Sequence, residues 1–524
     1  MTGTTPPNVL FIITDQQRAD NAGFMGHPIL KTPNLDRLAA TGTVFDNAWV
    51  SNPVCMPNRS TIMTGRMPSA HGVIFNDRSL DWGVNTFVRR FRSSGYRTGL
   101  LGKSHLQHGM SKNAITAFRG ESSGKNGYAE GWDNIEDFER YLDSLPDNPD
   151  DFYGFDHIEL AIDHGARATG HHLLWALARG ANRDDLLIDQ DAPALPGSSH
   201  SQHWKQVYRP PYPEEFHSTA FVTERTMAFI DQAHREEKPW LAFCSFPDPH
   251  HPFTPPGDWF DLYRPEEMIL PESRRDPLTD APEHLRLFAS IHPRDQRNWV
   301  APCGYGSDEL LADAMAASFG SISMIDQGVG QVLSHLEDLK ISDNTIVVFT
   351  SDHGDMMGDH SLFLKGFMHY RGTLQVPMVI NVPGKAPSRT EELASSIDLA
   401  PTLLDLCGIR GYDGIQGVSL APLLDDPAAA VRDHVLIEDD VAMITARLTP
   451  IPARTRTLIR DGYRYTRNSK GEEQLFNLAE DPDEMHDIRG DAAARTAMLT
   501  AMTDAMMMAD DSSRGAPATE STKG

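Results

Sequence analysis

Four short apolar runs, each followed at once by polar residues, constrain the fold of this chain more than any other feature. The runs span residues 9–13, 98–101, 240–246 and 345–350. Continuous apolar runs of this length, separated by long amphipathic stretches, are typical of buried parallel strands. They predict an α/β fold, with a mostly parallel sheet that carries helices on both faces.

Amphipathic stretches between these runs predict helices at residues 32–41, 217–236 and 309–339. The third stretch contains Gly328 and Gly330, where we expect the helix to break. Two further stretches are rich in Gly, Pro, Asp and His and show weak periodicity, so we interpret them as long insertions over the functional site. These insertions are residues 110–216 and 254–305.

The pattern changes after residue 430 and predicts a second, smaller unit. Short alternating runs at 434–438, 456–459 and 463–466, followed by a helical stretch at 492–508, predict a small antiparallel sheet with a closing helix. We therefore expect a catalytic α/β domain, a small α+β subdomain and a disordered tail. Their ranges are 1–430, 431–509 and 510–524.

The charge balance excludes some classes of partner. The 524 residues include 47 Lys and Arg and 73 Asp and Glu, which gives a formal net charge of −26. This balance argues against a nucleic-acid-binding or membrane-binding protein, because both functions need a positive surface. No apolar stretch reaches the length of a bilayer span and no signal peptide is visible, so we expect a cytoplasmic protein. The four cysteines form no CxxC pair, and we expect no disulfides.

The polar clusters that follow the apolar runs contain the types of residue that carry chemistry. Asp15, Lys103, His250 and Asp352 each follow a different run. In open α/β sheets the ligand site lies beyond the carboxyl ends of the strands, so these clusters predict one site built from distant segments. Any anionic substrate of so acidic a chain must meet a local group of positive charges there.

The segment from Cys55 to Arg59 reads C-M-P-N-R. Pro57 suits the first turn of a helix, which would put residue 55 beside the free N–H groups of that helix, where an anion is favoured. The segment resembles the C-x-P-x-R signature of the sulfatases. The resemblance extends in the family's order through the blocks at 8–15, 103–105, 249–253, 351–354, 397–408 and 474–485.

This resemblance implies an alkaline-phosphatase-like fold and a sulfatase that splits a small-molecule sulfate ester. It also implies that a formylglycine-generating enzyme oxidises Cys55 to formylglycine. Carried over by position, the family's metal ligands are Asp15, Gln16, the modified Cys55, Asp352 and His353. Two carboxylates and an amide oxygen suit Ca²⁺ or Mg²⁺, of which we favour Ca²⁺, and the imidazole widens the choice toward Mn²⁺.

The resemblance also implies roles for the basic side chains. Arg59 would hold the aldehyde hydrate and the cation, and Lys103, His250 and Lys365 would hold the ester oxygens. We assign leaving-group protonation to His250 and action on the hydrate to His105, since imidazole titrates near neutral pH. Asn76 is a further expected substrate contact. His251 is expected to be structural, and the histidines of the first insertion are not distinguished from one another.

The substrate class stays open between two alternatives. Gln16 and His353 stand where many sulfatases carry Asp and Asn, and both variants resemble choline-sulfatases and phosphonate monoester hydrolases. The Lys103-x-His105 pair favours sulfate esters, and a phosphonate monoester or phosphodiester hydrolase is the alternative. A degenerate protein that only binds an ester gains little support, because all the catalytic positions hold competent residues. The methionine-rich stretch at 492–508 leaves a homo-oligomer open.

Overall fold

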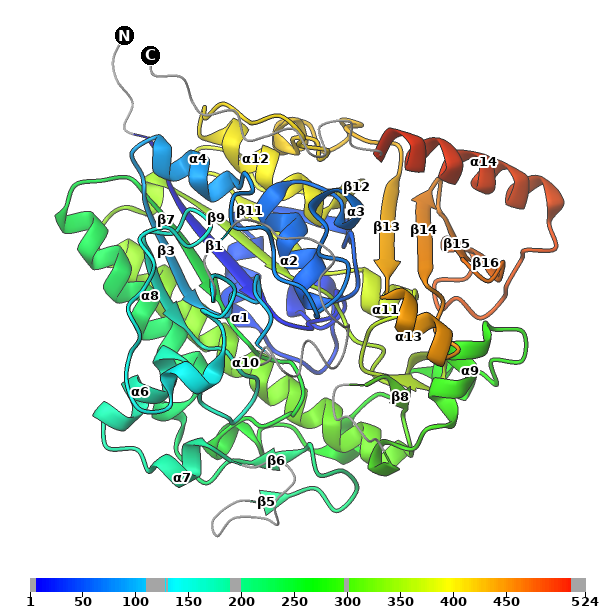
Figure 1. Ribbon diagram of the computed structural model, residues 1–524, viewed down its shortest axis with the longest axis horizontal. Helices are drawn as coiled ribbons and strands as arrows, with labels where there is room; N and C mark the ends of the chain where they lie inside the picture. Colours follow the sequence, from blue (N-terminus) through cyan, green and yellow to red (C-terminus); the bar gives the residue numbers. More distant parts are fainter. Residues whose placement is uncertain (1–5, 110–127, 129–130, 189–198, 296–300, 510–524) are drawn as a thin grey trace.

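An eight-stranded sheet organises the larger part of this computed structural model, which describes residues 6–109, 128, 131–188, 199–295 and 301–509 (Figure 1). The strand order is β12-β2-β11-β9-β1-β7-β3-β4. In chain order the strands are β1 (Asn8–Thr14), β2 (Thr43–Trp49), β3 (Arg97–Gly102), β4 (His157–Leu160), β7 (Trp240–Ser245), β9 (Thr345–Ser351), β11 (Met378–Asn381) and β12 (Ser388–Ser395).

The four predicted strands are confirmed, and they form the contiguous set β9-β1-β7-β3. Adjacent strands within this set pair in parallel; Phe11, for example, pairs with Val348 and with Phe243. β12 pairs in parallel with β2, and β11 runs antiparallel to both β2 and β9. The predicted mostly parallel α/β sheet is therefore confirmed, and all four polar clusters follow the same edge of it.

Helices cover both faces of the sheet because β1 is apolar on both sides. Val9, Phe11 and Ile13 pack toward α2 (Cys55–Thr64), α4 (Phe87–Ser93) and α12 (Leu399–Leu406). Leu10 and Ile12 pack toward α1 (Pro33–Ala39), α8 (Ser218–Arg235) and α10 (Asp308–Asp338). Successive side chains of a strand point to opposite faces, so a strand that is buried on both faces is apolar throughout.

The predicted helices correspond to α1, α8 and α10, but the predicted break in the third is wrong. α10 runs unbroken through Gly328 and Gly330. A Cβ on Gly328 would lie 2.4 Å from Thr223 Oγ1 of α8, and one on Gly330 would lie 2.4 Å from the Asn34 side chain of α1. These glycines therefore allow close helix packing, and the contacts of the helix outweigh their low helix propensity.

The stretches predicted as insertions carry regular elements of their own. Residues 110–216 include β4, α6 (His171–Ala178), α7 (Arg183–Leu186), β5 (Ser199–His200) and β6 (Tyr208–Arg209). Residues 254–305 include α9 (Glu283–Ser290) and β8 (Cys303–Gly304). Because β4 pairs with β3, the first of these stretches supplies an edge strand of the main sheet.

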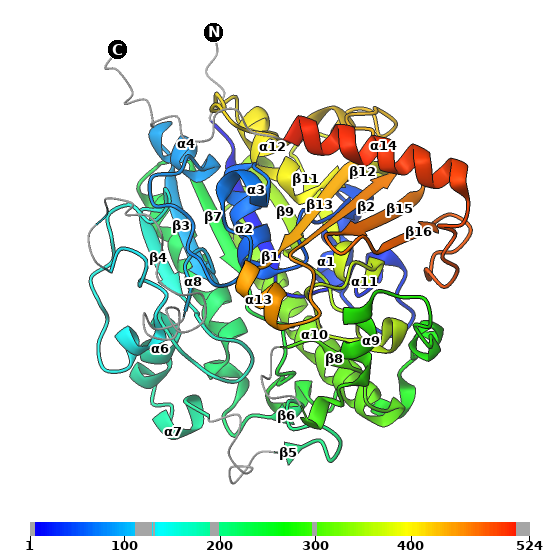
Figure 2. The same ribbon diagram turned by 45° about the vertical axis from the view of Figure 1, so that its right-hand side comes forward.

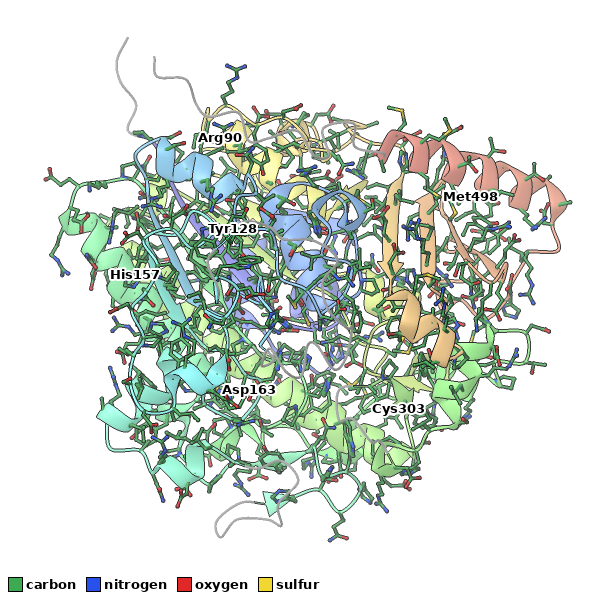
Figure 3. The ribbon with its side chains drawn as sticks, in the orientation of Figure 1. Arg90, Tyr128, His157, Asp163, Cys303 and Met498 are labelled. Carbon is green, nitrogen blue, oxygen red and sulfur yellow. The ribbon has the colours of Figure 1, made fainter. Side chains whose placement is uncertain are left out.

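The C-terminal part forms the predicted antiparallel sheet with a closing helix (Figure 2). Its strands are β13 (Val435–Asp440), β14 (Arg454–Arg460), β15 (Tyr463–Asn468) and the unpredicted β16 (Glu473–Asn477), and its helix is α14 (Ala492–Ala509). Met498 points from α14 toward the sheet, where it packs with Leu458 and Leu475 (Figure 3). The predicted tail at 510–524 lies outside the described residues.

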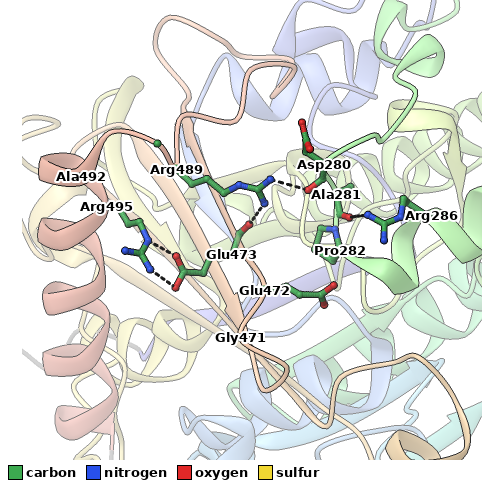
Figure 4. A pocket seen from close by; sticks show the side chains of 11 residues that line it. Asp280, Ala281, Pro282, Arg286, Gly471, Glu472, Glu473, Arg489, Ala492 and Arg495 are labelled. Carbon is green, nitrogen blue, oxygen red and sulfur yellow. Dashed lines mark hydrogen bonds and ion pairs between the residues drawn. The ribbon is translucent and has the colours of Figure 1, made fainter.

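Arg489 joins this sheet to the main body beside a pocket of about 610 Å³, and Arg495 of α14 joins the helix to the sheet (Figure 4). Arg489 donates to the backbone oxygens of Glu473 and Asp280, and Arg495 pairs with the Glu473 carboxylate.

The remaining short helices are α3 (Pro68–His71), α11 (Arg371–Leu374) and α13 (Met443–Leu448), and the short strand β10 is Leu362–Phe363. Among the described helices, none combines the length and apolar character needed to cross a membrane.

Candidate active site and metal centre

Cys55 lies at the N-terminus of α2, as its sequence context predicts. It is the first residue of the helix, with Val54 as N-cap, and is 1% exposed. Asn76 Oδ1 accepts a hydrogen bond from the Met56 N–H at 3.1 Å, which satisfies one of the free donors of the first turn. The expected substrate contact Asn76 therefore also holds the helix start that carries Cys55.

The described residues include one buried cluster with the donor atoms of a metal site. The ligand atoms of Asp15, Cys55, Asp352 and His353 all lie within 4.8 Å of one another. Cys55 Sγ is 3.1 Å from His353 Nε2 and 3.8 Å from Asp15 Oδ1. Buried carboxylates need compensating positive charge, so two of them beside an imidazole fit a divalent cation.

Gln16 completes the residues assigned to the metal, but its amide has protein partners. Its backbone N–H donates to Asp352 Oδ1 at 3.1 Å, and its φ of 69° turns the chain sharply at the end of β1. Its Oε1 accepts from Lys365 Nζ at 2.8 Å, and its Nε2 donates to Asp355. His251 Nδ1 lies 3.1 Å from the same Nε2, so the histidine expected to be structural contacts a site residue.

Three cationic side chains surround the cluster and are themselves buried. Arg59 donates from Nε to Asp352 Oδ2 at 2.6 Å and from Nη1 to Ser245 Oγ at 2.9 Å. Lys103 Nζ pairs with Asp15, and Lys365 Nζ lies 3.2 Å from Cys55 Sγ. These side chains provide the local positive charge that an acidic chain needs in order to bind an anion.

The charges of the site set the protonation of its acids. Burial alone would raise the pKa of Asp15, but Lys103, His250 and Lys365 hold that pKa well below its usual value. Burial and Asp15 raise the pKa of the Cys55 thiol, yet the positive charges of Lys103 and Lys365 bring it below its ordinary value overall. Residue 55 therefore occupies a position that favours negative charge.

The histidines of the site lie along one side of Lys103 and Asp15. The His250 ring stacks on the His164 ring, with centroids 3.8 Å apart, and His164 Nε2 is 2.5 Å from Lys103 Nζ. Burial and the nearby positive charges lower the pKa of both His105 and His250 well below the usual value. These shifts favour the neutral form of both imidazoles.

His164 and Asp355 are contacts of the site that the sequence did not single out. His164 follows β4 by four residues and lies 3.6 Å from Asp15 Oδ2. Because β4 ends at the same sheet edge as the other strands, recognition of this strand would have identified His164. Asp355 Oδ1 accepts from the Leu364 N–H at 3.1 Å, and no pattern in the sequence indicates that contact.

Two buried nitrogen atoms of the site, a guanidinium donor and an imidazole nitrogen, have no hydrogen-bond partner within the part of the chain that the structure describes. They are Arg59 Nη2 and His105 Nδ1. Buried polar atoms are rarely left without partners, and each such atom needs an explanation. An anionic ligand with protonated and unprotonated oxygens would satisfy a guanidinium donor and an imidazole nitrogen in either role.

Comparisons with known proteins show which families and relatives this chain resembles. The family model described as Sulfatase matches residues 7–409, and the model described as N-sulphoglucosamine sulphohydrolase, C-terminal, matches residues 358–510. An arylsulfatase of Clostridium perfringens (strain 13 / Type A) is 30% identical over 493 residues, which cover 91% of this chain and 89% of the relative. The choline-sulfatase of Rhizobium meliloti (strain 1021) is 27% identical, with coverages of 92% and 82%.

A solved structure extends the likeness to three dimensions. The phosphonate monoester hydrolase of Agrobacterium radiobacter superposes with a TM-score of 0.75 at 24% identity. The match covers 96% of this chain and 95% of that one. At this identity the likeness establishes a shared fold.

Proposed function

Since the chain belongs to the sulfatase family of the alkaline phosphatase superfamily and is a sulfuric ester hydrolase, we propose that it hydrolyses a sulfate monoester at Cys55, after conversion of that residue to formylglycine. The observation that carries this proposal is the position of Cys55 at a helix start, between two buried lysines and beside two buried carboxylates. The products are an alcohol and inorganic sulfate.

One divalent cation belongs to the proposed site. Asp15, Asp352 and His353 would hold it together with Gln16 and residue 55, and their oxygen-rich donor set favours Ca²⁺, with Mn²⁺ or Mg²⁺ as alternatives. A bound cation would polarise oxygen on residue 55 and offset charge on the ester. The Gln16 Oε1 that would face the cation also accepts a hydrogen bond from Lys365 Nζ, and an amide oxygen has a second lone pair for this purpose.

A formylglycine hydrate carries two hydroxyls on one carbon, so that one can attack sulfur and the other can later expel sulfate. An ordinary Cys or Ser lacks this second route. The modification must come from a formylglycine-generating enzyme that reads Pro57 and Arg59. Because Cys55 is 1% exposed, that enzyme would need access to the segment before it is buried.

The side chains of this protein bind the ester and move its protons. Lys103 and Lys365 contact Asp15 from two sides, so a sulfate group beside residue 55 lies within reach of both ammonium groups. His250 would donate a proton to the leaving oxygen, and His105 would accept one from the hydrate. Burial and the charges near His250 lower its pKa and favour its neutral form, so His250 would gain this proton as the anionic ester binds and offsets those charges.

His164 gives a prediction specific to this chain. His164→Ala should lower kcat/KM for an aryl sulfate by about 10–100-fold, because it removes the side chain that contacts Lys103 and stacks on His250. Steady-state kinetics with para-nitrophenyl sulfate measures this effect. The control is His157→Ala, in the same segment but paired with Glu159 away from the site, and it should leave kcat/KM unchanged. Equal losses of kcat/KM in the two variants would contradict a specific role for His164.

A phosphonate monoester or phosphodiester hydrolase that uses the same site is the second candidate. Gln16 and His353 favour it, because they lower the negative charge around the cation relative to an Asp and Asn pair. Lys103 and His105 favour sulfate. The cytoplasmic location stays a prediction.

Peptide mass spectrometry tests the nucleophile directly. Co-expression with a formylglycine-generating enzyme should give a residue-55 peptide with the mass of an aldehyde in place of the thiol, and kcat should rise in proportion to the converted fraction. Full activity in a preparation whose Cys55 remains an unmodified thiol would contradict the proposed nucleophile.

A further inference from the structure

The loop that carries Lys365 has an unusual backbone conformation. Leu364 and Phe367 have φ angles of 70° and 62°, in the left-handed region that non-glycine residues rarely adopt, and Gly366 between them has a φ of 85°. Such conformations persist only where surrounding contacts determine them. The Lys365 ammonium depends on this loop for its position 3.2 Å from Cys55 Sγ.

Two buried carboxylates hold this loop, one on each side of Lys365. Asp355 Oδ1 accepts from the Leu364 N–H at 3.1 Å, and Asp439 Oδ2 accepts from the Phe367 N–H at 2.9 Å. Asp355 follows β9 in the main body, whereas Asp439 lies in β13 of the C-terminal sheet. The small sheet therefore supplies one of the two carboxylate contacts to this loop, which also receives hydrogen bonds from the Met356 N–H at Leu364 O and from His284 Nε2 at Phe367 O.

Asp439 is an unfavourable residue at a position that only supports the fold, because burial of its carboxylate destabilises the folded state. Its side chain is fully buried, with His369 Nε2 at 3.4 Å as its other contact and the charge of Arg456 nearby. Its Oδ1 has no hydrogen-bond partner among the described residues. A buried carboxylate destabilises a fold unless its contacts compensate, so the contact with the Phe367 N–H calls for a functional explanation.

Glu438, which precedes Asp439 in β13, contacts the segment before Cys55. The Glu438 N–H donates to Ser51 O at 2.9 Å, and Glu438 O accepts from Asn52 Nδ2 at 2.5 Å. Asn52 Oδ1 in turn accepts from the N–H of Val54, the N-cap of the helix that begins at Cys55. Adjacent residues of one strand thus contact the segment before Cys55 and the loop of Lys365.

We propose that β13 positions Lys365 relative to residue 55, with Asp439 as a positioning residue that acts through the Phe367 N–H. This inference rests on the proposed function, in which the Lys365 ammonium holds the transferred sulfate group. A displacement of about 1 Å at such a group is enough to lower a rate by about 10²-fold. The C-terminal sheet is then part of the catalytic apparatus, because it fixes the position of a group in the active site.

A double-mutant cycle with Lys365→Ala tests this role. Asp439→Leu should lower kcat/KM for para-nitrophenyl sulfate by about 10–100-fold in the wild-type background, but by less than about 2-fold when Lys365 is already alanine. Asp439→Asn keeps an oxygen that can accept the Phe367 N–H and should stay within about 3-fold of wild type. Equal losses from Asp439→Leu in both backgrounds, or equal losses from Leu and Asn, would overturn the proposal.

Ile437→Val is the matched control for loss of stability, because it removes one buried methyl group from the same strand. It should lower the Tm and leave kcat/KM unchanged. If Asp439→Leu does not fold, Asp439→Ala enters the same cycle with the same expected pattern. A loss of activity in Ile437→Val as large as that in Asp439→Leu would show a general effect of the sheet and contradict the specific one.

Hydrogen–deuterium exchange separates this inference from the proposed function. The peptide that spans 362–368 should exchange faster in Asp439→Leu than in Asp439→Asn or wild type, because its anchored amide is released. This readout does not depend on turnover of any ester. If the wild type fails to hydrolyse sulfate esters, the proposed function is wrong. Unchanged hydrogen–deuterium exchange of the 362–368 peptide in Asp439→Leu would separately overturn the positioning role.

Discussion

Cys55→Ala and Cys55→Ser are both expected to lower kcat/KM for an aryl sulfate by at least about 10⁴-fold, with the fold retained. Alanine removes the nucleophile. Serine keeps one hydroxyl but lacks the second, which the proposed mechanism needs in order to expel sulfate. Steady-state kinetics, with a circular dichroism spectrum and a Tm for each variant, measures the effect.

Cys407→Ala is the control for this pair, because Cys407 is a free thiol at the end of α12 and is not part of the site. It should keep the activity of the wild type. The serine variant tests the need for the second hydroxyl more directly than the alanine variant. Full turnover by Cys55→Ser would mean that a single hydroxyl suffices, and the formylglycine proposal would be wrong.

Removal of the divalent cation is expected to lower kcat by at least about 10³-fold, which corresponds to about 4 kcal/mol of transition-state stabilisation. Without the cation, Asp15 and Asp352 remain paired with Lys103 and Arg59, so these cationic groups are less available to the ester. Dialysis against a chelator, followed by activity and metal analysis, tests this. Added Ca²⁺ should restore turnover.

Chelator saturated with Ca²⁺ provides the control, because it tests whether the chelator itself inhibits the enzyme. Restoration by Mn²⁺ or Mg²⁺ but not by Ca²⁺ would change the assigned ion and leave the site in place. Full activity at a metal content far below one ion per chain would contradict a catalytic cation.

The positions of the main strands could be predicted because these strands are buried on both faces. Such strands are apolar throughout, and the polar residues after them mark the edge of the sheet where a site forms. β4 escaped prediction because it is only four residues long and alternates between buried and partly exposed positions. His164, which depends on β4 for its place, could not be separated from the other histidines for the same reason.

Contacts between segments far apart in the chain explain the remaining differences. The low helix propensity of Gly328 and Gly330 suggested a break, but the neighbouring helices need the space that these residues leave. The contacts of the Gln16 amide with Lys365, Asp355 and His251 depend on three different loops. Asp439 looks like one acidic residue among several in β13, and only the fold brings it to the Phe367 N–H.

The ratio of kcat/KM for an aryl sulfate to kcat/KM for the matched aryl phosphonate monoester tests the central claim most directly. Both values come from one preparation, so the ratio does not depend on the fraction of converted Cys55, and it reports differential binding of the two transition states. The account predicts a ratio well above one, because Lys103 and His105 favour sulfate. A ratio well below one would contradict it and would identify Gln16 and His353 as the better indicators of the substrate.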